Sequence, residues 1–173
     1  MKNKKVWIIA GTIAVLAIAV AVFAILNAWD IGAKQESQDN ATVTVVAGDK
    51  EETFDLAYLK TFDKSEFSTV VDTSKTDPEE RGFGGVPLAT VLDDLGFSLD
   101  GAEQVVFKAA DGYTTVVTAL EAADTQNVYL VYERDGKPSG TKQQGGSGPI
   151  EIVIAGDQFA QRWCKFLMEI EIQ

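Results

Sequence analysis

Histidine is absent from this 173-residue sequence, and cysteine occurs once, at Cys164. Without an imidazole, the chain has no Ser-His or Cys-His nucleophile, no ordinary histidine general base and no histidine-based zinc or haem site. A single cysteine also excludes an intramolecular disulfide and any cysteine cluster for zinc or iron–sulfur. Several common catalytic and metal-binding classes are therefore excluded, and we expect the lone cysteine to be buried.

Positive charge is scarce beyond the first residues of the chain. Beyond residue 29 there are 12 basic and 26 acidic residues, and 12 minus 26 is a net charge of −14. Nucleic-acid binding requires a basic face, so no nucleic-acid partner is expected. We interpret the acidic surface as a source of solubility and of repulsion from anionic surfaces, with docking of a basic partner as the alternative.

Charge is also absent from the apolar run between Val6 and Leu26, which follows Lys2, Lys4 and Lys5. As a helix this run is about 30 Å long, the hydrocarbon thickness of a bilayer. Residues 1–29 are therefore predicted to form one transmembrane signal anchor with the lysines in the cytoplasm. The protein is then a single-pass cell membrane protein with its C-terminal domain extracytoplasmic. The alternative is a cleaved secretory signal, which would release that domain.

Residues 30–41 are polar and show no apolar periodicity, which is typical of a flexible linker. Residues 42–173 are enough for one domain. Most predicted elements are short strands in hairpins: Thr42–Val46 with Glu51–Leu56, Gln104–Ala109 with Tyr113–Val117, Asn127–Glu133 before the turn Asp135-Gly136, and single strands at Phe67–Val71, Ile150–Ile154 and Phe166–Ile172. In the last strand we expect Phe166, Met168, Ile170 and Ile172 to share one face.

A few helices separate these strands. Pro87 begins a helix with an apolar face that ends at Gly96. Shorter helical elements are predicted around Leu56–Phe62, at Ala119–Ala123 and at Gln158–Trp163. The polar stretch Asp72–Arg81 is predicted to be a loop of functional interest. The fold class is thus α+β, a mixed β domain with short helices.

Two features could bind an anion. The glycine-rich segment with Gly146, Ser147 and Gly148 could present main-chain N–H groups as a nest, although such a segment is also typical of a mobile connector. Arg162 and Lys165, two cations three residues apart, could hold a phosphate, or could pair with neighbouring carboxylates.

Five motifs in order carry a family resemblance: GVPLATVLDDLG, VVFKAADGYTTVV, VYLVYERDGKP, GSGPIEIVIAG and QRWCKFLMEIEI. Together they resemble the molybdopterin-binding domain of the sulfite oxidase family of oxidoreductases. The resemblance implies the sulfite oxidase fold, with molybdopterin as the cofactor it suggests. It also implies that Gly146–Pro149, Arg162 and Lys165 lie near the pterin phosphate.

The chain departs from that family in one respect. Catalytic members ligate molybdenum through a cysteine thiolate in the loop that corresponds to Val71–Phe83, and this loop has no cysteine. Asp72, Thr73 or Ser74 occupies the approximate position. We therefore expect no molybdenum and a non-catalytic, membrane-anchored domain that binds a small ligand or a partner protein. The alternatives are a pterin-dependent oxidoreductase subunit with unusual metal ligation and an adhesion or assembly scaffold.

Overall fold

The computed structural model of the chain describes residues 16, 20–21, 42–73 and 76–173. Nearly all of the expected anchor, residues 1–29, and the whole linker, residues 30–41, lie outside the described residues. Within the described ranges, no helix is long and apolar enough to cross a membrane. The domain that follows belongs to the second of two compact units, Gln38–Gln173.

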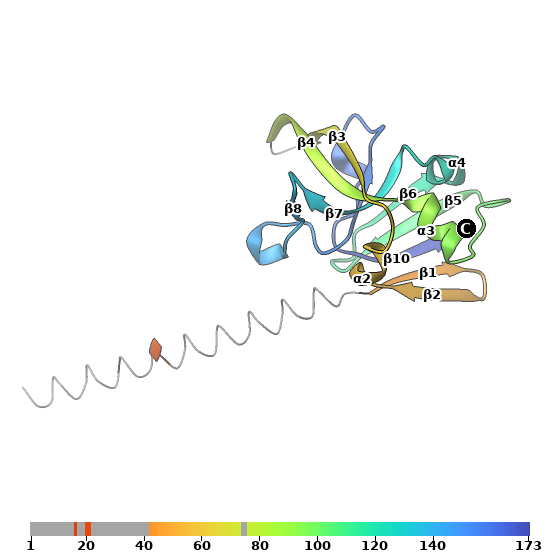
Figure 1. Cartoon of the computed structure of the whole chain (residues 1–173), viewed down its shortest axis with the longest axis horizontal. Helices are drawn as coiled ribbons and strands as arrows, with labels where there is room; N and C mark the ends of the chain where they lie inside the picture. The colour runs from red at the N-terminus through yellow and green to blue at the C-terminus, as the bar shows by residue number, and fades with distance from the viewer. Residues whose placement is uncertain (1–15, 17–19, 22–41, 74–75) are drawn as a thin grey trace, which may run out of the picture. The chain divides into compact units, whose positions relative to one another are not determined.

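One five-stranded sheet joins the beginning and the end of the domain (Figure 1). Its order is β2-β1-β10-β5-β6, with bounds Lys50–Phe54, Val43–Ala47, Leu167–Ile172, Gln104–Ala109 and Thr114–Thr118. The predicted first hairpin and the hairpin with the Asp111-Gly112 turn are confirmed as antiparallel pairs. The last strand, β10, lies between them, parallel to β1 and antiparallel to β5.

The second five-stranded sheet contains the long hairpin β3–β4. Its path is β3-β4-β7-β8, and β9 pairs with β7, with bounds Ser65–Thr73, Thr76–Pro87, Val128–Arg134, Lys137–Pro138 and Glu151–Ile154. All of its pairings are antiparallel. The predicted Asp135-Gly136 turn between β7 and β8 is confirmed, with both residues at positive φ (49° and 72°), as a two-residue hairpin turn requires.

In the ranges 42–73 and 76–173, the helices are short and lie between strands. They are α2 (Leu56–Leu59), α3 (Leu88–Asp94), α4 (Ala119–Ala123), η1 (Lys142–Gln144) and η2 (Ala160–Arg162). The helix after Pro87 is confirmed: α3 buries three apolar side chains, and Gly96 follows it at φ +72°. In α4, Thr118 and Glu121 form a capping box that satisfies N–H groups at its start.

The core is one apolar cluster to which both sheets and α3 contribute. Phe107, Leu130, Ile152 and Leu92 are among its fully buried side chains. Aromatic rings anchor the β3–β4 hairpin to this core: Phe67 stacks on Tyr129 with ring centres 4.1 Å apart, and Phe83 meets Trp163 edge to face at 5.4 Å. Such pairs each add about 0.5–1.5 kcal/mol beyond burial, so the hairpin is fixed at its base.

The prediction of a loop at Asp72–Arg81 is wrong, because β3 runs to Thr73 and β4 begins at Thr76. A polar sequence that contains proline can form a strand here, because β4 pairs with β7 only from Phe83 onwards and, among the described residues, the earlier part of β4 is unpaired on that side. Pro78 therefore needs no hydrogen-bond partner on that side.

The expected apolar face of the last strand also differs in part. A bulge shifts the register of β10 between Leu167 and Glu169. Leu167 is consequently buried, whereas Met168 is 47% exposed. Ile170 and Ile172 lie in the core, as predicted.

Candidate functional site

The glycine-rich segment is closed by hydrogen bonds within its own loop. Its N–H groups donate to main-chain carbonyls: Gly146 to Thr141 (2.8 Å), Ser147 to Ser139 (3.1 Å) and Gly148 to Gly140 (2.9 Å). Each of these N–H groups already has an acceptor within the loop, for which an anion would have to compete.

The two glycines allow close packing. A Cβ on Gly146 would overlap the carbonyl of Ser139, and Gly148 has φ +94° with the ring of Phe166 packed against it. A side chain would clash at both positions, and at Gly148 the positive φ also favours glycine. These residues therefore shape the loop, and their assignment as an anion site stays a prediction.

Arg162 lies between two carboxylates. Its Nε donates to Asp157 at 3.0 Å. Its Nη2 contacts Asp157 as well and donates to Glu121 at 2.9 Å. Hydrogen bonds donated to these carboxylates raise the pKa of Arg162, and the Arg162 contact lowers the pKa of Glu121. Arg162 thus links η2 to α4, as the alternative interpretation of this residue expected. Lys165 is exposed beside Cys164.

A charged pair that the sequence did not lead us to predict, Arg134 with Glu151, lies next to the glycine-rich segment. Glu151 is 0% exposed on β9. Its carboxylate accepts two hydrogen bonds from Arg134, at 2.7 Å from Nε and 2.6 Å from Nη2, and one from Ser147 Oγ at 2.8 Å. The available signal was a glutamate inside the apolar run Ile150–Ile154. Charged residues are rarely fully buried unless they are paired, so the run implied a partner.

Arg134 lines a cavity of about 490 Å³, here called the loop cavity. Residues of the β3–β4 hairpin, the β7–β8 turn and the loop after β8 line it, including Glu79, Arg81, Arg134, Asp135, Lys137 and Ser139. The Ser139 side chain is buried, and Oγ has no hydrogen-bond partner among the described residues. A buried hydroxyl without a partner is unusual and costs stability, so this atom is a candidate ligand contact.

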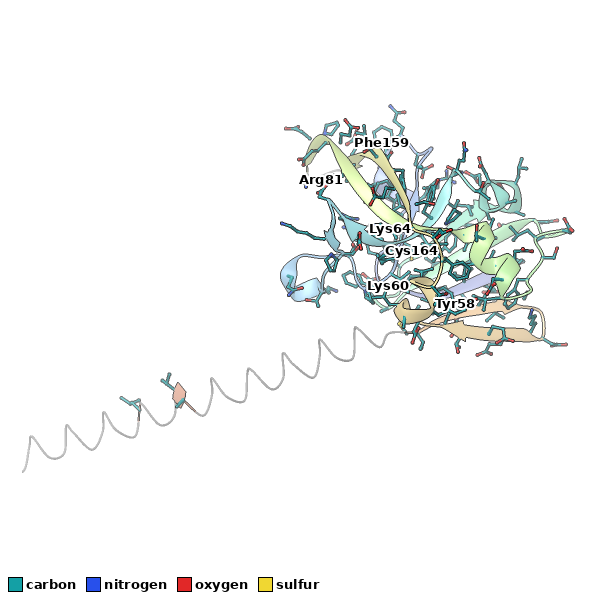
Figure 2. All side chains as sticks on the ribbon, viewed as in Figure 1. Tyr58, Lys60, Lys64, Arg81, Phe159 and Cys164 are labelled. Carbon is teal, nitrogen blue, oxygen red and sulfur yellow. The ribbon has the colours of Figure 1, made fainter. Side chains whose placement is uncertain are left out.

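The hairpin side of the loop cavity carries its own ion pairs. Arg81, labelled on the β3–β4 hairpin in Figure 2, donates to Asp135 at 2.7 Å and to Glu79 at 2.8 Å. Asp135 also accepts from the N–H of Gly82 at 3.0 Å. These contacts lower the pKa of Asp135 and raise that of Arg81. The turn between β7 and β8 is thereby tied to β4.

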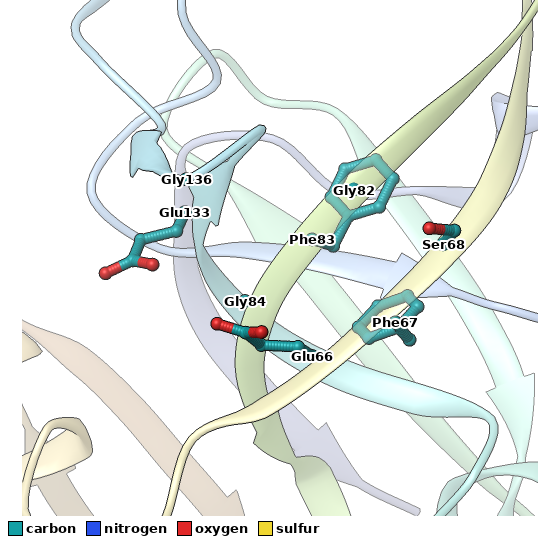
Figure 3. A pocket seen from close by; sticks show the side chains of 8 residues that line it. All are labelled: Glu66, Phe67, Ser68, Gly82, Phe83, Gly84, Glu133 and Gly136. Atoms are coloured by element: carbon teal, nitrogen blue, oxygen red, sulfur yellow. The ribbon is translucent and has the colours of Figure 1, made fainter.

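A second cavity, of about 520 Å³, lies over β3, β4 and β7 (Figure 3). Its lining includes Glu66, Phe67, Gly82, Phe83, Gly84 and Glu133. The two glutamates are bridged by Lys64 Nζ, which lies 2.9 Å from each of them. The carboxylates already have a cationic partner, and the rest of the lining consists of two phenylalanines, one serine and glycines. We regard the loop cavity as the better candidate.

The residues present do not fit a molybdenum centre. Cys164, labelled in Figure 2, is completely buried, and its main chain bridges to Ile152. Burial is the main cause that raises the pKa of its thiol to about 12, so the thiol is protonated at neutral pH, and it has no exposed surface at which to meet a metal. Asp72 is half-buried in β3, and Ser74 lies outside the described residues.

Comparison with known proteins agrees with this architecture. The chain is similar to a solved structure described as "Crystal Structure of the Sulfane Dehydrogenase SoxCD from Paracoccus pantotrophus", at 15% identity and a TM-score of 0.65. The match covers 79% of this chain and 39% of the dehydrogenase chain. No curated protein matches significantly in sequence. The family model of the oxidoreductase molybdopterin binding domain matches residues 33–173. The chain therefore belongs to the oxidoreductase molybdopterin-binding domain family.

Proposed function

We propose that the chain is a membrane-anchored, extracytoplasmic member of this family that binds a small ligand and performs no molybdenum redox chemistry. The observation that carries the proposal is the place of its one thiol. Cys164 is in the core, and the segment Val71–Phe83 offers only oxygen and nitrogen groups. Catalytic members of this family ligate molybdenum through a thiolate, and this chain lacks a cysteine at that place.

The groups expected to hold a pterin phosphate support the same proposal. Arg162 is engaged by Asp157 and Glu121, and the N–H groups of Gly146–Gly148 donate within the loop. To bind a phosphate, Arg162 would have to give up its carboxylate partners. Lys165 alone is a weak determinant, because an exposed lysine contributes one screened charge.

The second candidate function is a pterin-dependent oxidoreductase subunit with unusual metal ligation. The observation in its favour is the family match over residues 33–173. Fold and family do not fix activity, since sites change while folds persist.

Metal and pterin analysis of the full chain, produced in its native host, separates the two candidates. We expect molybdenum and pterin to be far below one per chain. Stoichiometric molybdenum or a pterin released by acid would overturn the proposal and favour the oxidoreductase. A molybdenum enzyme purified from the same cells is the positive control, because it shows that the host was supplied with cofactor.

Membrane attachment is tested separately. The apolar run Val6–Leu26 supports an anchor. We expect the full chain to sediment with membranes, to stay there in high salt or carbonate, and to dissolve in detergent. A matched variant with Leu16→Arg and Val20→Arg should lose this behaviour, because arginine near the middle of a span costs about 2.5–3.5 kcal/mol. Release of the unmodified chain by carbonate would contradict the anchor.

A further inference from the structure

We propose that the loop cavity binds a small monoanionic ligand through a carboxylate group, which Arg134 and Ser139 hold together. This inference rests on the proposed function, that of a ligand-binding domain, and specifies its ligand class. Both residues line the same cavity of about 490 Å³, one on β7 and the other in the loop after β8. The cavity is open, so only the carboxylate end of the ligand is specified.

Arg134 is already oriented for this role. Its Nε and Nη2 donate to Glu151, which is fully buried and also held by Ser147. Within the described part of the chain, Nη1 has no acceptor, and the side chain remains 26% exposed. A planar guanidinium has five N–H donors and forms two-point contacts with carboxylates. The edge of Arg134 that Glu151 leaves unused is therefore available to a second carboxylate.

Ser139 supplies the second contact. The residue is 6% exposed, and its Oγ has no partner among the described residues. Its backbone is fixed on both sides, because its N–H donates to Tyr132 at 3.0 Å and its carbonyl accepts from Ser147 at 3.1 Å. The hydroxyl oxygen itself is buried, so a rotation of the Ser139 side chain would bring it to the cavity, where a ligand oxygen would satisfy it.

The charges of the wall favour a single negative charge. Arg134 is balanced by Glu151, and Arg81 faces two carboxylates, Glu79 and Asp135. Lys137 adds one further cation to the lining. The net charge of these side chains is near zero, in a domain that is otherwise strongly acidic. The cavity therefore accepts a monoanion more readily than a dianion such as phosphate.

Arginine side-chain NMR of the full chain in detergent tests this directly. The sequence has only three arginines, Arg81, Arg134 and Arg162, so their Nε–H signals are assigned by single substitutions. Acetate is the probe and inorganic phosphate the comparison, at constant ionic strength. We expect acetate to shift the Arg134 signal in a saturable way and to leave Arg162 unchanged as an internal control. No saturable shift at Arg134, or equal shifts at all three arginines, would overturn the inference.

Ser139→Ala is the matched variant, and it separates a binding role from a structural one. Removal of an unsatisfied hydroxyl should leave the melting temperature without ligand unchanged or raise it. The same change should weaken acetate binding about 3–10-fold, the loss of one hydrogen bond. Unchanged acetate affinity would overturn the role of Ser139. Arg134→Lys keeps a charge against Glu151 but removes the fork, and we expect it to abolish the acetate-dependent rise in melting temperature that the unmodified chain should show.

The outcomes separate the ligand class from the broader proposal. A molybdenum-free chain that does not respond to acetate would overturn the carboxylate site alone. A chain that carries molybdenum or pterin would overturn the proposed function, whatever acetate does. A stronger response to phosphate than to acetate would overturn the monoanion assignment.

Discussion

The carboxylate of Glu151, with no exposed surface, accepts two hydrogen bonds from the guanidinium of Arg134, at 2.7 and 2.6 Å. The pair links β9 to the end of the neighbouring strand β7, where Arg134 lines the loop cavity. A buried ion pair contributes little by itself, but a charge left alone in the interior is strongly unfavourable.

The first prediction concerns this pair. Arg134→Met should destabilise the domain by about 3–5 kcal/mol in urea unfolding, because Glu151 would keep its charge without a partner. The double variant with Glu151→Met should recover at least half of that loss. Losses that simply add in the double variant would show that the two residues do not act as a pair.

The second prediction concerns Arg162. Arg162→Gln should lower the free energy of unfolding by about 1–2 kcal/mol, because charge-assisted bonds to Asp157 and Glu121 are lost from a partly exposed site. Acid unfolding should change as well. The pKa of Glu121 is lowered mainly by Arg162, so this contribution is present above its ordinary pKa and is lost as the pH falls. The variant should therefore be less sensitive to acid. Equal stability at pH 7 would contradict the structural role.

The third prediction uses two glycines of β4. A Cβ on Gly85 would overlap the carbonyl of Leu130 and lie 2.8 Å from Val131 Cα, whereas a Cβ on Gly82 has its nearest neighbour at 3.8 Å. Gly85→Ala should cost about 3 kcal/mol or more, since rigid backbone cannot yield. Gly82→Ala, the matched control in the same strand, should change stability by less than about 1 kcal/mol. Similar effects of both changes would contradict the close approach of β4 and β7.

The fourth prediction is a loss of stability at high pH. Burial raises the pKa of the Cys164 thiol to about 12, from about 8.5 in an unfolded chain. The stabilisation is complete below about pH 8.5 and is lost as pH rises toward 12, by at most about 1.4 kcal/mol per pH unit. Urea unfolding between pH 8.5 and 10 avoids Tyr58, whose pKa is also raised to about 12.

Cys164→Ala is the control for that measurement, because it removes the titrating group. Its unfolding free energy should fall less steeply over the same pH range. The unmodified thiol should also resist alkylation at pH 7 in the folded protein and react in urea. Rapid alkylation of the folded chain would contradict burial of Cys164.

Local sequence signals predicted much of the fold. The Asp-Gly turns and the proline before α3 act over a few residues, and the structure contains each of them. The β3–β4 hairpin was missed because Asp72–Arg81 is polar and contains Pro78, a composition that local rules assign to loops. Met168 was placed wrongly because a bulge in β10 depends on pairing with β5.

The sequence by itself determined the absence of histidine, the missing cysteine in Val71–Phe83, the motif order of the family and the local turns. Only the tertiary structure decided which charges meet. Arg162 pairs with Glu121 and Asp157, and Arg134 with a glutamate on another strand, because folding brings together side chains that are distant in sequence. The orphan hydroxyl of Ser139 likewise arises from burial by its neighbours. Partner choice depends on geometry over ångströms, and no local pattern encodes it.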